Sequence, residues 1–257
     1  MPDPEMQIVV DVDGPVRRIR LHRPERLNAV TPEMLVALLE AIRASSRDLT
    51  VRVMTLEGSG RAFCAGGDLT APGQPSEGTV ALVNEVVVAL REAPYPVVAL
   101  VHGIAAGAGV SLVLACDVVM MGSTAALALG FSSIGLMPDG GATATLAAAV
   151  GRARALGLAV LGDTLSAAQA HDWGIASRVF DDDEFDARAD EVVQRLAQGP
   201  TAAFAQTKKA VDAATLGDLR AHLARERAAQ TELIATADGV AGVRAFVERL
   251  QPTFKGS

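Results

Sequence analysis

The sequence predicts an α/β protein whose C-terminal third is helical. Short apolar segments alternate with helical segments up to about residue 122, a pattern typical of strands joined by crossover helices. From about residue 140 onward the pattern becomes mostly helical. Half of the 257 residues are hydrophobic but only 4% are aromatic, so we expect a large core built from Ala, Val and Leu.

Turn and capping residues divide the N-terminal half into its elements. An Asp-Gly-Pro turn at 13–15 separates two β-rich segments, 6–14 and 16–24. Thr31 followed by proline is a typical helix start, and apolar residues at helical spacing continue this helix to residue 48. The other elements are expected as strands at 51–58, 97–101 and 117–121 and as helices at 78–92 and 109–115.

The C-terminal part divides into a series of expected helices. They are placed at 140–149, 152–161, 166–172, 184–198, 200–213, 218–236 and 238–250. Most of the last segments have many charges on one face, and the core of the same chain leaves them little surface to bury against. We therefore expect a core over residues 1–196 and a helical region over residues 197–257 that docks against other subunits.

Charge and cysteine content narrow the class of protein. A net charge of −7 and a pI of about 5.1 argue against a general binder of nucleic acid or anionic membranes. Cys64 and Cys116 are too few and too far apart for a disulfide framework or a zinc site. The N-terminus lacks the pattern of a signal peptide, and the longest apolar run, 95–122, is interrupted by His102, Asp117 and glycines. These features predict a soluble cytoplasmic protein.

Two glycine-rich stretches follow expected strands and leave backbone N–H groups open to a ligand. The first, at 60–69, reads GRAFCAGGDL, and its small residues would let a carbonyl group approach the main chain closely. The second, at 102–117, reads HGIAAGAGVSLVLACD, with a helix beginning at 107–109 whose free N–H groups favour negative charge. The alternatives are an ordinary glycine turn and close helix–strand packing. Neither stretch has the glycine spacing of a dinucleotide-binding fingerprint.

A third stretch, GLMPDGGAT at 135–143, places Asp139 between a proline and two glycines. One interpretation is a helix N-cap, because aspartate is favoured before a helical segment. The other is a catalytic acid facing an apolar pocket, where burial would raise its pKa towards useful basicity. The two interpretations are compatible.

These three stretches, in this order, resemble the enoyl-CoA hydratase/isomerase (crotonase) superfamily. The resemblance runs from HRPERLNAVT at 22–31 to AFVERLQPTFKG at 245–256, which is nearly the whole chain. The segment 131–179 looks most like the branch of ring-1,2-epoxyphenylacetyl-CoA and enoyl-CoA isomerases. The resemblance implies a spiral of ββα turns with a C-terminal helical trimerisation region. It also implies a homotrimer or a dimer of trimers.

The resemblance also implies a site. Members of the superfamily hold an acyl-CoA thioester carbonyl between two backbone N–H groups, and the matching positions here are Ala65 and Ala108. Hydratases use two glutamates, which align with Ser111 and Phe131, and neither residue can do acid–base work near neutral pH. Asp139 then remains as the acid–base group.

The substrate-binding residues are likewise implied by the resemblance. Arg26 with the Leu27-Asn28-Ala29 turn matches the adenine side of the coenzyme A site, and Phe254 and Lys255 match a C-terminal pair that can reach a neighbour's nucleotide. The pocket itself is expected to involve Ala65, Gly66, Gly67, Asp68, Leu69, Gly107, Ala108 and Phe131, with Asp68 supporting the turn. Coenzyme A enters as part of the substrate, and no metal or redox cofactor is implied.

The sequence thus predicts an acyl-CoA thioester isomerase in which Asp139 shuttles a proton during a double-bond shift or a ring-epoxide rearrangement. Two alternatives remain open at this stage: an enoyl-CoA hydratase and a catalytically degenerate acyl-CoA-binding protein. The sequence does not identify the acyl group.

Overall fold

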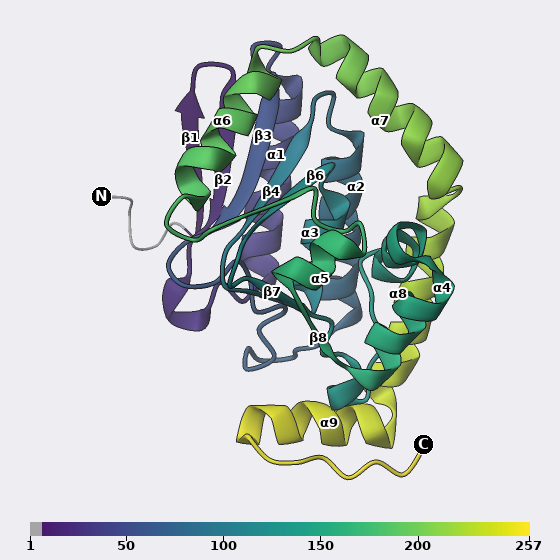
Figure 1. Cartoon of the computed structure of the whole chain (residues 1–257). Helices are drawn as coiled ribbons and strands as arrows, with labels where there is room; N and C mark the ends of the chain where they lie inside the picture. The colour runs from purple at the N-terminus through teal and green to yellow at the C-terminus, as the bar shows by residue number, and fades with distance from the viewer. Residues whose placement is uncertain (1–6) are drawn as a thin grey trace.

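The structure, a computed structural model, describes residues 7–257, and the expected strand at 6–14 therefore begins one residue outside it. Figure 1 shows a central sheet with helices around it. In the described residues this sheet has the strand order β1-β2-β3-β4-β6-β9, in which β1 and β2 are antiparallel and the other pairs are parallel. Its strands are β1 (Ile8–Asp13), β2 (Val16–Leu21), β3 (Val53–Gly58), β4 (Val97–Val101), β6 (Val118–Gly122) and β9 (Arg178–Phe180).

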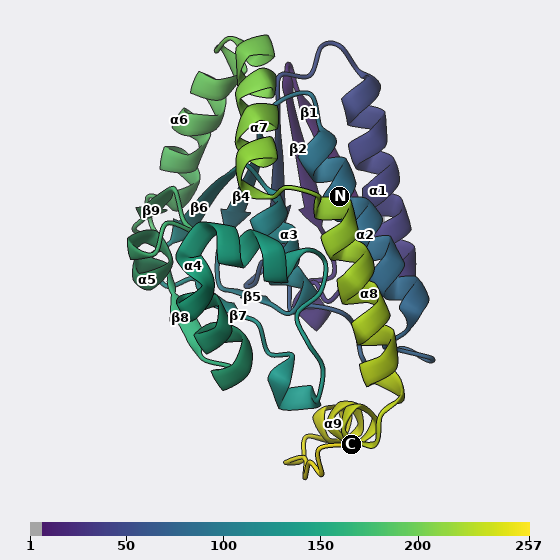
Figure 2. The same cartoon turned by 90° about the vertical axis from the view of Figure 1, so that its right-hand side faces the viewer.

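The two faces of this sheet are covered by different helices. Helices α1 (Pro32–Arg47), α2 (Glu77–Glu92) and α3 (Ala108–Ala115) lie on one side, and α6 (Phe185–Ala197) lies on the other (Figure 2). Side chains alternate between the faces: Val97 and Ala99 belong to the large core under α1–α3, whereas Val98 and Leu100 pack beneath α6. Burial on both faces explains why β4 is continuously apolar.

A second, smaller sheet brings the two glycine-rich stretches together. It consists of β5 (Ile104–Ala106), β7 (Ala126–Ala128) and β8 (Thr164–Ser166). Isolated bridges join Cys64 to Ala105 and Val30 to Gly67, so the loop after β3 lies against the segment that leads into α3.

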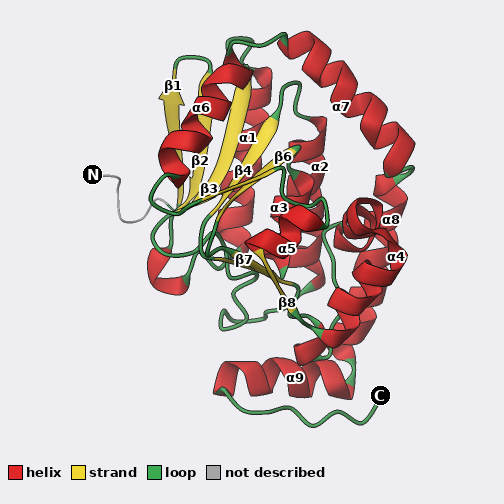
Figure 3. Cartoon of the chain, viewed as in Figure 1, coloured by secondary structure: helices red, strands yellow, loops and turns green. Residues whose placement is uncertain are grey.

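The remaining helices lie outside the two sheets (Figure 3). They are α4 (Ala142–Leu161), α5 (Ala167–Asp172), α7 (Thr201–Thr215), α8 (Leu219–Ala235) and α9 (Ala237–Glu248). Helix α8 packs against α2 and α4, and α9 packs against the short 3-10 helix η2 (Ser132–Ile134). Helix α7 runs along the edge of the molecule, as Figure 1 shows.

Helix α4 is an exception to the expectation that no apolar segment is long enough to span a membrane. By length and composition it could cross a membrane, with a mean hydropathy of 1.4. Gly151 in its middle has φ 78° and ψ 161°, which is not helical. Two shorter helices therefore meet there, as expected for 140–149 and 152–161.

The predicted fold class is confirmed, and the expected helices and long strands are found within a few residues of their predicted bounds. The three-residue strands β5, β7, β8 and β9 were not predicted. The division at residue 196 and the trimerisation role of the last helices stay predictions.

Candidate active site

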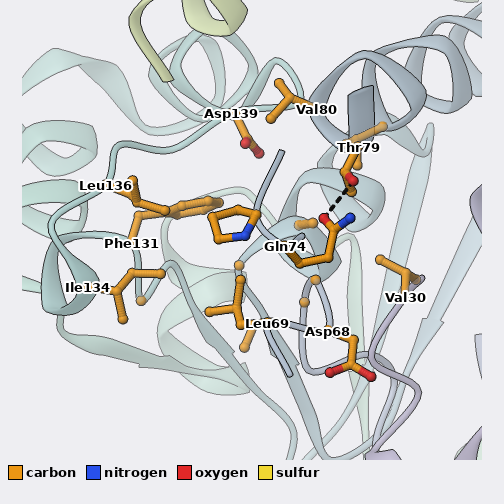
Figure 4. Close-up of a pocket in the computed structure, with 18 of the residues that line it drawn as sticks. Val30, Asp68, Leu69, Gln74, Thr79, Val80, Phe131, Ile134, Leu136 and Asp139 are labelled. Atoms are coloured by element: carbon orange, nitrogen blue, oxygen red, sulfur yellow. Dashed lines mark hydrogen bonds between the residues drawn. The ribbon is translucent and has the colours of Figure 1, made fainter. Parts of the chain in front are cut away.

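A cavity of about 170 Å³ lies where the glycine-rich loops meet α2, α8 and α9 (Figure 4). Its walls are mostly apolar, and the charged residues among those that the structure describes there are Asp68 and Asp139. Figure 4 shows these two side chains at opposite ends of the pocket. The lining residues are Val30, Ala65, Gly66, Gly67, Asp68, Leu69, Gln74, Pro75, Ser76, Thr79, Val80, Val83, Ala106, Gly107, Ala108, Leu129, Gly130, Phe131, Ser133, Ile134, Leu136, Asp139, Gln230 and Phe246.

Asp139 is not the N-cap of α4. That position is Gly141, with φ 79°, and no side chain of its own can cap the helix. The N–H groups of Gly141 and Thr143, at the start of α4, instead donate to the carboxylate of Glu226, on α8, at 2.6 and 2.9 Å. The Thr143 hydroxyl donates to the same carboxylate. A side chain from another helix therefore caps α4, which leaves Asp139 free for the cavity.

The turn at Asp139 is shaped by its contact with α3. Gly140 has φ 62°, and a Cβ there would lie 2.8 Å from the Cβ of Ser111 and 2.8 Å from Cγ1 of Val83. The Ser111 hydroxyl donates to the Asp139 carbonyl at 2.7 Å. Because only glycine fits between the turn and the helices, the sequence Asp-Gly-Gly holds Asp139 at this edge of the cavity.

Burial changes the acidity of Asp139. The residue is 6% exposed. Burial raises the pKa of Asp139 from 3.8 to about 7; a hydrogen bond from Gln230 opposes this rise, and the nearby Glu226 charge adds to it. A carboxyl group with such a pKa can both accept and return a proton near neutral pH.

The backbone donor predicted at Ala65 is wrong. The Ala65 N–H donates to the Leu27 carbonyl at 2.9 Å and is not available to a ligand. The next N–H, that of Gly66, points to the Cys64 sulfur at 3.4 Å. In the same turn the Gly67 N–H has no acceptor among the residues that the structure describes, and Gly67 lines the cavity. A turn of small residues indicates a donor but not which N–H supplies it.

The second donor position that the resemblance implies is Ala108. It is the first residue of α3, and its N-cap, Gly107, makes no side-chain capping bond. Within the described part of the chain the Ala108 N–H has no acceptor, as is normal for the first turn of a helix. The two loops touch, because a Cβ at Gly66 would lie 3.5 Å from Cα of Gly107. Gly67 and Ala108 therefore offer two N–H groups on neighbouring walls of one cavity.

Asp68 holds the loop that contains Gly67. Its carboxylate accepts hydrogen bonds from Arg23 at 2.6 Å and from the Thr70 hydroxyl and N–H at 2.6 and 3.0 Å. Burial opposes ionisation, but these contacts outweigh it and lower the pKa of Asp68. The carboxylate is thus already engaged on the protein side, which fits a role in supporting the turn.

Comparison with known proteins shows the family of this chain. The family model described as enoyl-CoA hydratase/isomerase matches residues 12–257. The chain belongs to the enoyl-CoA hydratase/isomerase family. It is 39% identical to the 1,2-epoxyphenylacetyl-CoA isomerase of Escherichia coli, over 97% of this chain and 98% of that one. It is 40% identical to a probable enoyl-CoA hydratase of Rhodobacter capsulatus, over 93% of each chain.

The solved structures lead to the same family. An enoyl-CoA hydratase from Mycobacterium avium subsp. paratuberculosis superposes with a TM-score of 0.92 at 41% identity, covering 97% of this chain and 99% of that one.

Among the sequence relatives, the chain is also 32% identical to the 2,3-dehydroadipyl-CoA hydratase of Escherichia coli, over 97% of this chain and 99% of that one. Both isomerases and hydratases of the enoyl-CoA hydratase/isomerase family are therefore among its relatives.

The residues expected on the adenine side of this enoyl-CoA hydratase/isomerase family site lie outside the cavity. Asn28 is 0% exposed, and its amide donates to the carbonyls of Ser59 and Ala62 while its oxygen accepts the Arg23 N–H. The Asn28 side chain therefore fastens the turn to the loop after β3. The predicted place of this turn on the adenine side stays a prediction. Arg26 is exposed on the 3-10 helix η1 (Pro24–Arg26), and Ala29 is half-buried beside it.

The predicted C-terminal pair also lies away from the cavity of its own chain. Phe254 and Lys255 are exposed, and their segment is held where the N–H of Lys255 donates to Asp238 at 2.7 Å. Their predicted contact with a neighbour's nucleotide stays a prediction. Of the other predicted pocket residues, Leu69, Gly107 and Phe131 all line the cavity.

Sequence reasoning missed the contribution of α8 and α9. Gln230 contacts Asp139, Glu226 caps α4, and Phe246 forms part of the cavity wall. Helix α8 has charged and polar residues of its own on all sides, so its sequence shows no apolar stripe that would indicate buried side chains. The described residues also bring together no group of three or more His, Cys, Asp or Glu side chains suited to a metal ion.

Proposed function

We propose that this protein is an acyl-CoA thioester isomerase in which Asp139 moves a proton between two carbons of the acyl group. The observation that carries the proposal is the buried Asp139 carboxyl, with a pKa of about 7, at one end of an apolar cavity. Free backbone donors at Gly67 and Ala108 line the same cavity. This combination suits a reaction in which negative charge develops on a thioester oxygen.

The reaction would proceed in two proton transfers. The thioester oxygen accepts hydrogen bonds from the Gly67 and Ala108 N–H groups, and ionised Asp139 removes a proton from a carbon next to the double bond. The electron pair of that C–H bond moves into the dienolate, whose oxygen the two donors stabilise. Protonated Asp139 then returns the proton to a different carbon, so the double bond shifts. Each donor contributes ~10²–10³ in rate and the acid–base group ~10²–10⁴.

Hydration is less well supported by this site. Of the two positions that align with hydratase glutamates, Ser111 is 1% exposed and its hydroxyl is used by the Asp139 carbonyl. Phe131 is part of the apolar wall. A hydratase would need Asp139 to activate water and protonate carbon unaided. It remains the second candidate because several relatives are named as hydratases.

The cavity favours an uncharged, apolar acyl group. No lysine, arginine or histidine lines the part that the structure describes. A carboxylate at the far end of the acyl chain would therefore be buried without a cation, which is costly. An alkyl chain or a ring fits these walls, and a relative of this chain is named as an isomerase of 1,2-epoxyphenylacetyl-CoA. We include ring-epoxide rearrangement as a variant of the same proton chemistry.

Coenzyme A would be bound as part of the substrate. Arg26, exposed on η1, offers a cation for its phosphates, and Phe254 and Lys255 would act from a neighbouring subunit of a homotrimer or a dimer of trimers. The proposed steps use no metal ion and no redox cofactor. We expect the enzyme in the cytoplasm.

The test is a product assay with a trans-3-enoyl-CoA and a trans-2-enoyl-CoA. We expect interconversion of the two double-bond isomers by the wild-type enzyme and a loss of ~10²-fold or more in Asp139→Asn. Asp172→Asn, at an exposed residue of α5, is the matched control and should retain full activity. A 3-hydroxyacyl-CoA as main product would favour the hydratase. Tight binding of acyl-CoA without any product would favour the degenerate binder.

A further inference from the structure

The side chain of Gln230 makes three hydrogen bonds in the wall of the cavity. Its amide nitrogen donates to the Met137 carbonyl at 2.9 Å and to Oδ2 of Asp139 at 3.0 Å. Its amide oxygen accepts the Met137 N–H at 3.2 Å. Gln230 is buried, so these partners are not replaced by water.

The two bonds to Met137 fix which way the amide of Gln230 points. The Met137 N–H can only donate, so it must face the amide oxygen. A flipped amide would place two donors against each other and would turn its oxygen towards the Met137 carbonyl and the Asp139 carboxylate. The main chain of Met137 therefore makes Gln230 a permanent donor to Asp139.

The two oxygens of Asp139 consequently differ. Oδ2 accepts the Gln230 N–H. Oδ1 accepts no hydrogen bond from any residue between 7 and 257, and Asp139 lines the cavity. The Gln230 N–H stabilises negative charge on Oδ2 and occupies one of its lone pairs, so Oδ1 is the oxygen that is protonated more readily.

We propose that Gln230 is a positioning residue that reserves Oδ1 of Asp139 as the one oxygen that exchanges protons with the substrate. This inference rests on the proposed role of Asp139 and goes beyond it by naming the atom and the residue that selects it. Gln230 does this without touching the reacting carbons. Because the same oxygen takes up the proton and returns it, the proton travels a shorter distance between the two transfers.

The surroundings of Asp139 leave Gln230 as its one polar side-chain partner in the described residues. Val80 and Val83 of α2 and the wall residues Phe131 and Leu136 are apolar. Ser111 of α3 contacts the Asp139 carbonyl rather than its carboxylate. The charged group that acts on it is Glu226, one helical turn before Gln230 on α8, whose charge raises the pKa of Asp139.

Removing the donor should change the ionisation of Asp139 in a measurable direction. Gln230→Met keeps an unbranched side chain of similar length but donates no hydrogen bond. The bond stabilises the ionised form, so its loss should raise the midpoint of the Asp139 titration by about one pH unit. The midpoint is read in the substrate-free protein by NMR of ¹³C-labelled aspartate, with the Asp139 signal assigned by its absence from Asp139→Asn.

The kinetic part of the test separates positioning from ionisation. At a pH about two units above both midpoints, Asp139 is ionised in the wild type and in Gln230→Met. Isomerisation of a trans-3-enoyl-CoA should still be slower in the variant, by ~10-fold or more in kcat with KM changed less than ~3-fold. Gln206→Met, the same substitution at an exposed position of α7, is the control and should match the wild type in both readouts.

A second variant guards against a folding defect in Gln230→Met. Gln230→Glu has almost the same shape and replaces the donor by a carboxyl group, so the Asp139 midpoint should rise in it as well. Unchanged midpoints in both variants would overturn the inference, and so would an unchanged kcat at high pH. A failure of the proposed function shows differently, as an Asp139→Asn enzyme that retains its turnover.

Discussion

The hydroxyl of Ser111 donates a 2.7 Å hydrogen bond to the carbonyl oxygen of Asp139. This contact joins the position that the resemblance aligns with a hydratase glutamate to the residue that we propose as the acid–base group. Ser111 is buried and serves the backbone of the turn, whereas the Asp139 side chain faces the cavity. In the proposed reaction Ser111 holds the turn and the Asp139 carboxyl transfers the proton.

Gly140 should be the most sensitive glycine of this turn. Gly140→Ala places a Cβ 2.8 Å from Ser111 and from Val83, in addition to the strain of a positive φ. We expect it to lose ~2–4 kcal/mol of unfolding free energy and most of its activity, because the turn must shift. Gly14→Ala is the control: its φ is 54°, but no atom of residues 7–257 lies within 4 Å of the added Cβ. Chemical denaturation of both variants separates steric contact from backbone strain, and equal losses would contradict the account.

Asp139→Asn should stabilise the protein above neutral pH. The folded pKa of Asp139 is about 7 and its unfolded value is 3.8, so the unfolded state loses its proton first as the pH rises. The group therefore destabilises the fold progressively between these two values and fully above pH 7. Asparagine cannot ionise and should raise the unfolding free energy at high pH by on the order of 4 kcal/mol. Thermal unfolding at several pH values measures this, with no gain expected below pH 3.8.

Glu226→Gln should move the pH–rate profile in the direction opposite to Gln230→Met. The negative charge of Glu226 raises the pKa of Asp139. Removing that charge should shift the acid limb of the profile, where kcat falls as Asp139 is protonated, to lower pH. Glutamine keeps one acceptor for the N–H groups of α4, so the helix should survive with a loss of ~1 kcal/mol. The profile of kcat against pH is the measurement. An acid limb that moves upward would show that Glu226 does not act through its charge.

The apolar walls should discriminate against dicarboxylic acyl groups. We expect kcat/KM for an unsubstituted medium-chain trans-3-enoyl-CoA to exceed that for the same chain with a terminal carboxylate by ~100-fold, because that carboxylate would be buried without a cation. A cation introduced at the cavity wall, as in Ile134→Arg, should reduce the ratio of these two kcat/KM values. A wild-type preference for the dicarboxylic ester would contradict the proposed substrate class.

The elements that the sequence predicted well are those with local signals. Thr31 and Pro32 mark the start of α1, and the structure confirms the cap, with Thr31 accepting the Met34 N–H at 3.2 Å. Strand β4 was recognised from a continuous apolar run. Strands β5, β7, β8 and β9 were missed because three residues show no period, and they form only where the tertiary fold brings their partners alongside.

The site was predictable where it depends on sequence neighbours and not where it depends on packing. Asp139 stood out because of the proline and glycines around it. The structure places the N-cap at Gly141 instead, and the capping carboxylate comes from Glu226, which lies far along the chain on α8. Gln230 lies on a polar helix and has no signal of its own. The shift of the first donor from Ala65 to Gly67 depends on a contact with Leu27 that no local pattern indicates.

The most direct test of the central claim is proton exchange at carbon. The enzyme is incubated with a trans-3-enoyl-CoA in D₂O at about pH 8, where Asp139 is ionised, and deuterium in the acyl chain is followed by mass spectrometry. We expect rapid incorporation with the wild type and a loss of ~10²-fold or more with Asp139→Asn at unchanged binding of the ester. Incorporation that continues at the wild-type rate in Asp139→Asn would contradict this expectation.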